Sequence, residues 1–206
     1  AFWGESTGMW ASVRPAGDTF GAPVLVSPNG SGTSLPEVAV APNGAAAVVW
    51  RGQDGGFLSQ AYVSVKPAGS SSFSAAQQVS TEAFAVPNVD PHVGIADNGT
   101  ALVVWHGFNL DGDETSGRIR QRYVNAAGVP QGAPQSISPA SPDGNQFPEV
   151  EVGPAGHALV TWVVGDSITG DPATYWQGPA NATPDLQAFN TNSGASIAGA
   201  VDSAGT

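Results

Sequence analysis

Three residues with metal-ligating side chains follow the same short motif at three places in the sequence. Each stands directly after a proline that opens a run of alternating apolar residues, and the three are Glu37, His92 and Glu149. Imidazole and carboxylate groups are ordinary protein ligands of divalent cations. If the fold brings these positions together, they predict a metal site. The alternative is that the three side chains are solvated separately at the starts of their strands.

A second group of candidate ligands lies in the segment NLDGDET, residues 109–115. Alternate positions offer the hard oxygen atoms that suit Ca²⁺, from Asn109, Asp111, Asp113 and Thr115. Gly112 falls inside the acidic triplet, whereas the EF-hand loop places its glycine after the triplet. No glutamate follows at the spacing of a bidentate ligand. The segment therefore predicts an exposed hairpin loop, with calcium binding as the alternative.

Four aromatic side chains are candidates for stacking against a sugar ring: Trp10, Tyr62, Tyr123 and Trp176. Tyr and Trp combine a large apolar face with a polar edge, which suits a wet, partly apolar ligand such as a glycan. The same properties suit packing inside a β-sheet protein. Both roles stay open for all four residues.

The residues that could perform catalysis do not form a recognisable motif. Arg118, Arg120 and Arg122 lie along one face of a predicted strand, about 7 Å apart at each step, so they cannot converge on one carboxylate. His106 and His157 have no serine or aspartate at the spacing of a nucleophile motif. The sequence therefore predicts no catalytic residue.

The elements that position the first three candidates are repeated along the chain. The segments PEVAVAPNGAAAVVW (36–50), PHVGIADNGTALVVW (91–105) and PEVEVGPAGHALVTW (148–162) each predict two strands joined by a tight turn. Gly44, Gly99 and Gly156 supply the turn residue, and each is followed six positions later by a tryptophan: Trp50, Trp105 and Trp162. We expect these tryptophans to fill the space between neighbouring units.

The second half of each unit also recurs, as VRPAGDTFGAPVLVS (13–27), VKPAGSSSFSAAQQVS (65–80) and, more loosely, VNAAGVPQGAPQSIS (124–138). It predicts a third and a fourth strand. Four short antiparallel strands in about 50 residues form the blade of a β-propeller, whereas an immunoglobulin-like domain needs about 100. In a propeller the first strand of each blade is innermost, so Glu37, His92 and Glu149 are expected around the central channel.

The predicted fold is an all-β propeller of four-stranded antiparallel blades, with about four blades' worth in this chain. The repeat units are approximately 1–34, 35–85, 86–146 and 147–194, and a partial unit, 195–206, complements the N-terminus. The segment ASIAGAVDSAGT (195–206) repeats the first strand, with Gly205 as its turn glycine, while AFWGES begins inside a second strand with Trp3 as its tryptophan. Either the ring closes on itself, or the repeats continue in a longer array or a neighbouring copy.

The pattern P-x-V-x-x-x-x-x-G-x-A-x-V-x-W, followed by R/K-P-A-G-x-x-F, resembles the repeats of secreted or surface β-propeller-like proteins of bacteria. These are broadly similar to sialidase-type propellers. The Ser-x-Asp-x-Gly-x-Thr-Trp box of many sialidase blades is missing here. The resemblance implies a fold and a location outside the cell, and it carries over no catalytic residue.

Composition narrows the function classes. The chain has 206 residues, 17 acidic against 6 basic side chains, a net charge of −11 and no cysteine. This charge disfavours nucleic-acid binding, and the missing cysteines exclude disulfide scaffolds and Cys-ligated zinc. No apolar run approaches the roughly 20 residues of a membrane span.

We therefore expect an extracellular or cell-surface module, non-enzymatic, with a structural or adhesive role toward a protein or a glycan. The alternatives are a lectin-like glycan binder and a glycan-processing enzyme with catalytic carboxylates in the channel mouth. No cofactor is expected apart from Ca²⁺. Self-association through the cut terminal blade is a further expectation.

Overall fold

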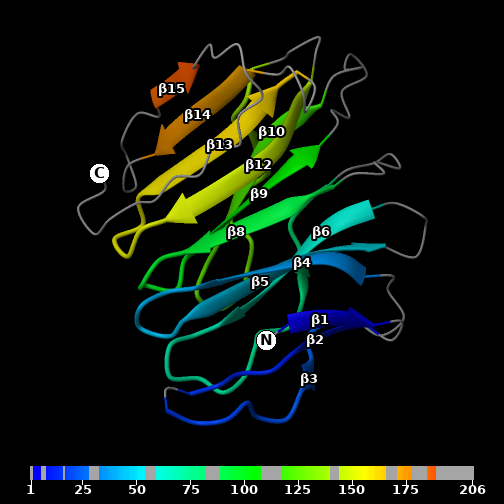
Figure 1. Ribbon diagram of the computed structural model, residues 1–206, viewed down its shortest axis with the longest axis vertical. Helices are drawn as coiled ribbons and strands as arrows, with labels where there is room; N and C mark the ends of the chain where they lie inside the picture. Colours follow the sequence, from blue (N-terminus) through cyan, green and yellow to red (C-terminus); the bar gives the residue numbers. More distant parts are fainter. Residues whose placement is uncertain are drawn as a thin grey trace.

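The computed structural model describes residues 2–5, 8–15, 17–27, 33–53, 59–81, 89–107, 117–139, 144–165, 171–177 and 185–188. All the regular secondary structure of these residues is β-strand, and every strand pairs antiparallel with its neighbours. The strands form four sheets that follow one another along the chain (Figure 1). The all-β prediction, with four-stranded antiparallel sheets, is confirmed. None of the described residues belongs to a helix long and apolar enough to cross a membrane.

Each sheet is a meander of consecutive strands. Sheet I contains β1 (Phe2–Glu5), β2 (Gly8–Ala11) and β3 (Val24–Leu25). Sheet II contains β4 (Thr33–Val40), β5 (Ala46–Gln53), β6 (Ser59–Lys66) and β7 (Gln77–Gln78). Sheet III contains β8 (Pro91–Ile95), β9 (Ala101–Gly107), β10 (Arg118–Val124) and β11 (Gln135–Ser136). Sheet IV contains β12 (Asn145–Val152), β13 (Ala158–Val164), β14 (Asp171–Gln177) and β15 (Asp185–Ala188).

The tight turns form where the repeated glycines predicted them. Gly44, Gly99 and Gly156 have φ of +84°, +80° and +91°, a conformation that glycine adopts at little cost. Neighbouring turns are also joined to one another. Asn43 donates from its side chain to the carbonyl of Asp97, and the Asp97 amide donates to the Pro154 carbonyl at 3.0 Å. These bonds fix the inner strands of sheets II, III and IV against one another.

The hydrophobic core lies between the sheets, and the repeated tryptophans fill it as predicted. Trp50, Trp105 and Trp162 have 0%, 0% and 1% of their surface exposed. Trp50 packs with Met9 and Ala11 of sheet I, Trp105 with the valines of sheet II, and Trp162 with Leu102 of sheet III. In sheets II, III and IV, the repeated tryptophan therefore packs against the preceding sheet. A single sheet could not bury both faces alone, so stacking of the repeats supplies the core.

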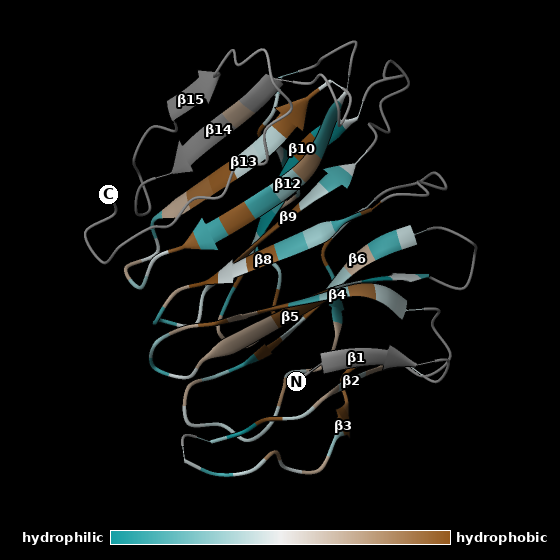
Figure 2. Cartoon of the chain, in the orientation of Figure 1, coloured by the Kyte–Doolittle hydropathy of each residue, from teal (hydrophilic) through white to brown (hydrophobic). Residues whose placement is uncertain are grey.

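The strands β4, β8 and β12 lead their sheets and lie side by side, β4 on β8 and β8 on β12. Polar and apolar residues alternate along them, as the teal and brown bands of β12 show in Figure 2. Among the described residues, no strand occupies this leading position in sheet I. Its β1 pairs with β2 as β5 pairs with β6, with Trp3 opposite Trp10 and Trp50 opposite Tyr62. The four described sheets form an open stack, with sheets I and IV at opposite ends of the long axis (Figure 1).

Two of the three leading strands contain a β-bulge next to the repeated proline. The register of β4 shifts between Ser34 and Glu37, and the register of β12 shifts between Gln146 and Glu149. At the same places Leu35 and Phe147 have φ of +51° and +54°. A left-handed backbone at an apolar residue costs of order 1 kcal/mol, so the surrounding structure must impose it. A bulge changes the direction of the side chain that follows it, here those of Glu37 and Glu149.

Candidate functional site

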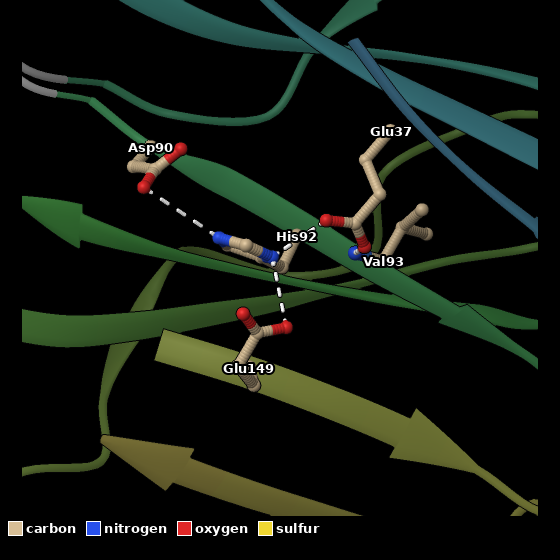
Figure 3. A network of polar contacts seen from close by, with 5 residues as sticks. All are labelled: Glu37, Asp90, His92, Val93 and Glu149. Carbon is tan, nitrogen blue, oxygen red and sulfur yellow. Dashed lines mark hydrogen bonds and ion pairs between the residues drawn. The ribbon is translucent and has the colours of Figure 1, made fainter. Parts of the chain in front are cut away.

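The leading strands of three sheets bring Glu37, His92 and Glu149 together. One potential ligand atom from each residue lies within 4.8 Å of the others. The Nδ1 atom of His92 is 2.5 Å from Oε2 of Glu37 and 3.3 Å from Oε2 of Glu149 (Figure 3). The three residues stand seven positions before Gly44, Gly99 and Gly156, so the internal repeat places them at equivalent points of β4, β8 and β12.

Asp90 completes the group, which we call the inner-strand cluster: Glu37, Asp90, His92 and Glu149. Its carboxylate lies on the other side of the imidazole, with Oδ2 3.6 Å from Nε2 of His92 (Figure 3). Both ring nitrogens of His92 therefore face carboxylates. The His92 side chain is only 14% exposed, whereas that of Glu149 is 62% exposed. The cluster is buried on the His92 side and open to solvent on the Glu149 side.

A backbone contact fixes Glu37 independently of the histidine. Its Oε1 atom accepts a hydrogen bond from the amide of Val93 at 3.0 Å. Charge-assisted bonds of this kind are roughly twice as strong as neutral ones. The Glu37 carboxylate therefore bridges β4 and β8, with one oxygen on the backbone and the other on the imidazole.

His92 is positively charged at neutral pH. Burial alone would lower its pKa, but polar contacts with Asp90 and Glu37, and the charges of Glu37 and Glu149, raise the pKa to about 10. The same contact with His92 lowers the pKa of Asp90. Burial, followed by the negative charges of Glu37 and Glu149, raises the pKa of Glu151, two residues further along β12. Three carboxyl groups, those of Glu37, Asp90 and Glu149, thus face one imidazolium.

The donor set fits a divalent cation that accepts both nitrogen and oxygen. Imidazole suits Zn²⁺, Fe²⁺ and Ni²⁺, and carboxylates also suit Mn²⁺. Because Nδ1 of His92 faces both glutamates, a bound cation would take the place of the proton on that nitrogen. Metal binding would then release one proton. Three protein ligands leave further coordination positions for water or for an external ligand.

The four predicted glycan-stacking residues lie in four different sheets. Tyr62 is half-buried and stacks on Trp50, with ring centroids 6.0 Å apart and planes 13° from parallel. Tyr123 is half-buried against the core between sheets III and IV. Trp10 is half-buried in β2, and Trp176 is in β14, with its side chain outside the described residues. A shared aromatic platform is therefore not seen among the described side chains, and glycan stacking stays a prediction.

The predicted calcium segment, with Asn109, Asp111, Asp113 and Thr115, lies outside the described residues. Of the nearby arginines, Arg122 donates to the carbonyl of Gly132 at 2.7 Å and to that of Val79 at 3.1 Å. This guanidinium therefore ties sheet III to sheet II.

Two acidic residues are absent from the sequence-based prediction: Asp90, a member of the inner-strand cluster, and Glu151, whose pKa is raised by two members of that cluster. Asp90 occupies the repeat position held elsewhere by Leu35 and Phe147, directly before the proline. Glu151 occupies the position of Ala39 and Gly94, five residues before the turn glycine. In both cases the available signal was a charged residue at a repeat position that is otherwise apolar or small.

Comparison with known proteins supports the fold. No protein-family model matches the sequence, and no curated protein sequence matches it. Among solved structures, the Hadza microbial sialidase Hz136 matches with a TM-score of 0.53 at 10% identity, over 75% of this chain and 37% of that chain. The endo-arabinase from Bacteroides thetaiotaomicron VPI-5482 matches with a TM-score of 0.45 at 10% identity, over 92% of this chain and 74% of that chain. The chain thus spans little more than a third of the sialidase, and the likeness shows a propeller-like fold.

Proposed function

We propose that this protein is a non-enzymatic extracellular binding module on a β-propeller scaffold, and that the inner-strand cluster holds a divalent cation through which it binds a glycan or protein ligand. One observation carries this proposal: ligand atoms of Glu37, His92 and Glu149, from three successive sheets, lie within 4.8 Å of one another. The repeat explains why three strands meet, but it does not require ligating side chains at all three positions.

The open side of the cluster supports a role in binding. Glu149 is 62% exposed, so a cation beside it would face solvent. The remaining coordination positions of the cation could accept hydroxyl or carboxylate oxygens, which glycans and acidic protein side chains provide. The chain has a net charge of −11 and would repel an anionic ligand directly. A cation bound between the cluster and such a ligand would offset this repulsion.

The test is titration calorimetry of the EDTA-treated protein with Mn²⁺, Zn²⁺ and Ca²⁺ at several pH values. Because the cation displaces a proton from His92, whose pKa is about 10, the affinity should rise about tenfold per pH unit between pH 6 and 8. Glu37→Gln and Glu149→Gln should each weaken binding at least about tenfold, whereas the control Asp18→Asn, in an exposed turn, should not. Failure of all three cations to bind at pH 8 would refute the proposal.

A glycan-processing enzyme is the second candidate, and Glu151 favours it. Glycoside hydrolysis needs one protonated carboxyl group beside an ionised one, with their pKa values pushed apart. Glu151 has a raised pKa and feels the charges of Glu37 and Glu149, so it is the candidate acid. The native protein and Glu151→Gln are tested for release of reducing sugar from a panel of polysaccharides. Release by the native protein that is abolished in Glu151→Gln would favour the enzyme. Inactivity of the native protein on the panel would favour the binding module.

A further inference from the structure

Two large apolar side chains near the inner-strand cluster are exposed on a strained backbone. Leu35 and Phe147 are 45% and 49% exposed, and their φ angles are +51° and +54°. They are the two non-glycine residues with positive φ in the part of the chain that the structure describes. Exposure of a large apolar side chain and a left-handed backbone are each unfavourable, so their combination at two equivalent repeat positions needs a cause. Residues held in such a conformation cluster at ligand-binding sites.

On β12, Phe147 lies on the open side of the cluster. Three exposed residues, Phe147, Glu149 and Glu151, alternate with the buried Pro148 and Val150. Residues at alternate positions of a strand point to the same face, and the burial pattern shows that the bulge does not break this alternation. Glu149 marks the side on which the cluster is open to solvent. The phenyl ring of Phe147 is therefore exposed on the same side as the Glu149 carboxylate.

The internal repeat places Leu35 in the corresponding position of β4. Leu35, Asp90 and Phe147 each stand two residues before a member of the predicted metal site. Asp90 shows how near this position is to the cluster, because its Oδ2 atom lies 3.6 Å from Nε2 of His92 (Figure 3). Since β8 lies between β4 and β12, Leu35 and Phe147 flank Asp90 on the two neighbouring strands. We call these three residues the rim: two apolar side chains with one carboxylate between them.

Neither core packing nor backbone geometry accounts for the two apolar rim residues. Among the described residues, neither Leu35 nor Phe147 is part of a buried core cluster. A bulge that needed only a left-handed backbone would be served best by glycine, which the same chain uses at its tight turns. The side chains of Leu35 and Phe147 therefore have a use outside the core, beside the inner-strand cluster.

We propose that Leu35 and Phe147 hold the carbon–hydrogen face of a neutral sugar, while two vicinal hydroxyl groups of that sugar coordinate the cation of the inner-strand cluster; this rests on the proposed function. A sugar ring has an apolar face and a polar edge. Apolar and aromatic side chains beside a few well-placed polar groups are the usual lining of a small-molecule site. The ionised Asp90 carboxylate only accepts hydrogen bonds, so it suits a further hydroxyl group, which donates.

The charges of the site favour a neutral sugar over an acidic protein segment. Glu37, Asp90 and Glu149 bring three carboxylates to the cluster, and one divalent cation offsets two of these charges. The carboxylate of an acidic side chain would lie beside Asp90, where like charges repel. Hydroxyl groups can bind the cation without that repulsion. A sugar ring also supplies the apolar face that an aspartate or glutamate side chain lacks.

The experiment removes the apolar rim side chains and keeps the backbone conformation. Glycine adopts the left-handed conformation freely, so Leu35→Gly and Phe147→Gly should keep the bulges and the positions of Glu37 and Glu149. Phe147→Tyr keeps an aromatic ring. Val129→Gly, which removes a similarly exposed apolar side chain between β10 and β11, is the matched control. Circular dichroism melting of each full-length variant checks that it is folded.

Titration calorimetry measures the affinity of each variant for Mn²⁺, Zn²⁺ and Ca²⁺. With the tightest-binding of these cations present, it then measures the affinity for the methyl glycosides of glucose, galactose, mannose and xylose. At least one glycoside should bind the native chain, and only when the cation is present. Leu35→Gly and Phe147→Gly should each weaken that binding at least about fivefold while the cation affinity is unchanged. Phe147→Tyr should restore most of the affinity lost in Phe147→Gly, and Val129→Gly should bind like the native chain.

The contrary results separate this inference from the proposed function. A protein that binds none of the three cations refutes the proposed function and this inference with it. Cation binding without binding of any of the glycosides overturns this inference alone. Glycoside binding that both glycine variants retain also overturns it, because the bulges would then serve only to orient Glu37 and Glu149. An equal loss of cation and glycoside affinity overturns it as well, since Leu35 and Phe147 would then act through the backbone.

Discussion

His92 is expected to give this protein an unusual loss of stability at alkaline pH. Its pKa is raised from 6.5 to about 10 in the folded protein, so the folded state binds a proton that the unfolded state releases between these values. The contribution of His92 to the free energy of unfolding is therefore fully present below about pH 6.5 and is lost as the pH rises through 10. Most proteins change little over this interval, since few groups titrate there.

The magnitude follows from the same contacts. At about 1.4 kcal/mol per pH unit, the full difference in pKa would contribute about 5 kcal/mol to the free energy of unfolding. The side chains of Glu37, Asp90 and Glu149 are 34%, 39% and 62% exposed, so water screens their attraction for the imidazolium. We therefore expect about 2 to 3 kcal/mol to be lost between pH 6.5 and 10.

Urea unfolding followed by tryptophan fluorescence, with EDTA present, measures this loss. His92→Gln should be less stable than the native chain at pH 6.5, and its stability should change much less toward pH 10. His157→Gln, at a half-exposed turn residue, serves as the control and should keep the native slope. A native stability that is flat between pH 6.5 and 10, or an equal slope in His92→Gln, would refute the reasoning.

Three further predictions concern the scaffold and the polar loop. Each of the single replacements Trp50→Ala, Trp105→Ala and Trp162→Ala should lower the free energy of unfolding by about 3 to 5 kcal/mol in urea denaturation, because each indole is fully buried between two sheets. A loss below about 1 kcal/mol would contradict this prediction. Gly94→Ala should lower the free energy of unfolding by about 1 to 3 kcal/mol in the same measurement, since the added Cβ atom would lie 2.9 Å from the backbone nitrogen of Val152. The control Gly21→Ala should lower it less, because the nearest atom to its added Cβ would be 3.5 Å away. If residues 109–115 bind Ca²⁺, Asp111→Asn with Asp113→Asn should abolish a calcium-dependent rise in the melting temperature, and an unchanged native melting curve with calcium would indicate a plain loop.

The repeat made the scaffold predictable. The turn glycines and the tryptophans recur at fixed spacing, and each has a direct physical consequence: a positive φ at Gly99 and a buried indole at Trp105. Strand pairing within a sheet then follows from chain order alone. The convergence of Glu37, His92 and Glu149 was also predictable, because equivalent positions of stacked repeats lie beside one another.

The geometry that shapes the cluster was not predictable from the repeat. The bulges before Glu37 and Glu149 require a left-handed backbone at Leu35 and Phe147, residues that rarely adopt it. No local signal distinguishes these apolar residues from ordinary strand positions. Asp90 is absent from the prediction for a related reason, because its contact with His92 depends on how β8 enters the sheet.

The chemistry of the site arises where the chain departs from its own repeat. Three glutamates at the equivalent positions would place like charges within about 5 Å of one another, which is unfavourable. The middle sheet carries His92 instead, and its position between β4 and β12 lets one imidazolium face the glutamates of both neighbours. Exchange of that proton for a cation would keep this alternation of charge while adding open coordination positions. If the cluster binds a cation as we propose, the protonated form of this arrangement would support the fold, the cation form would support binding, and pH would set the balance between them.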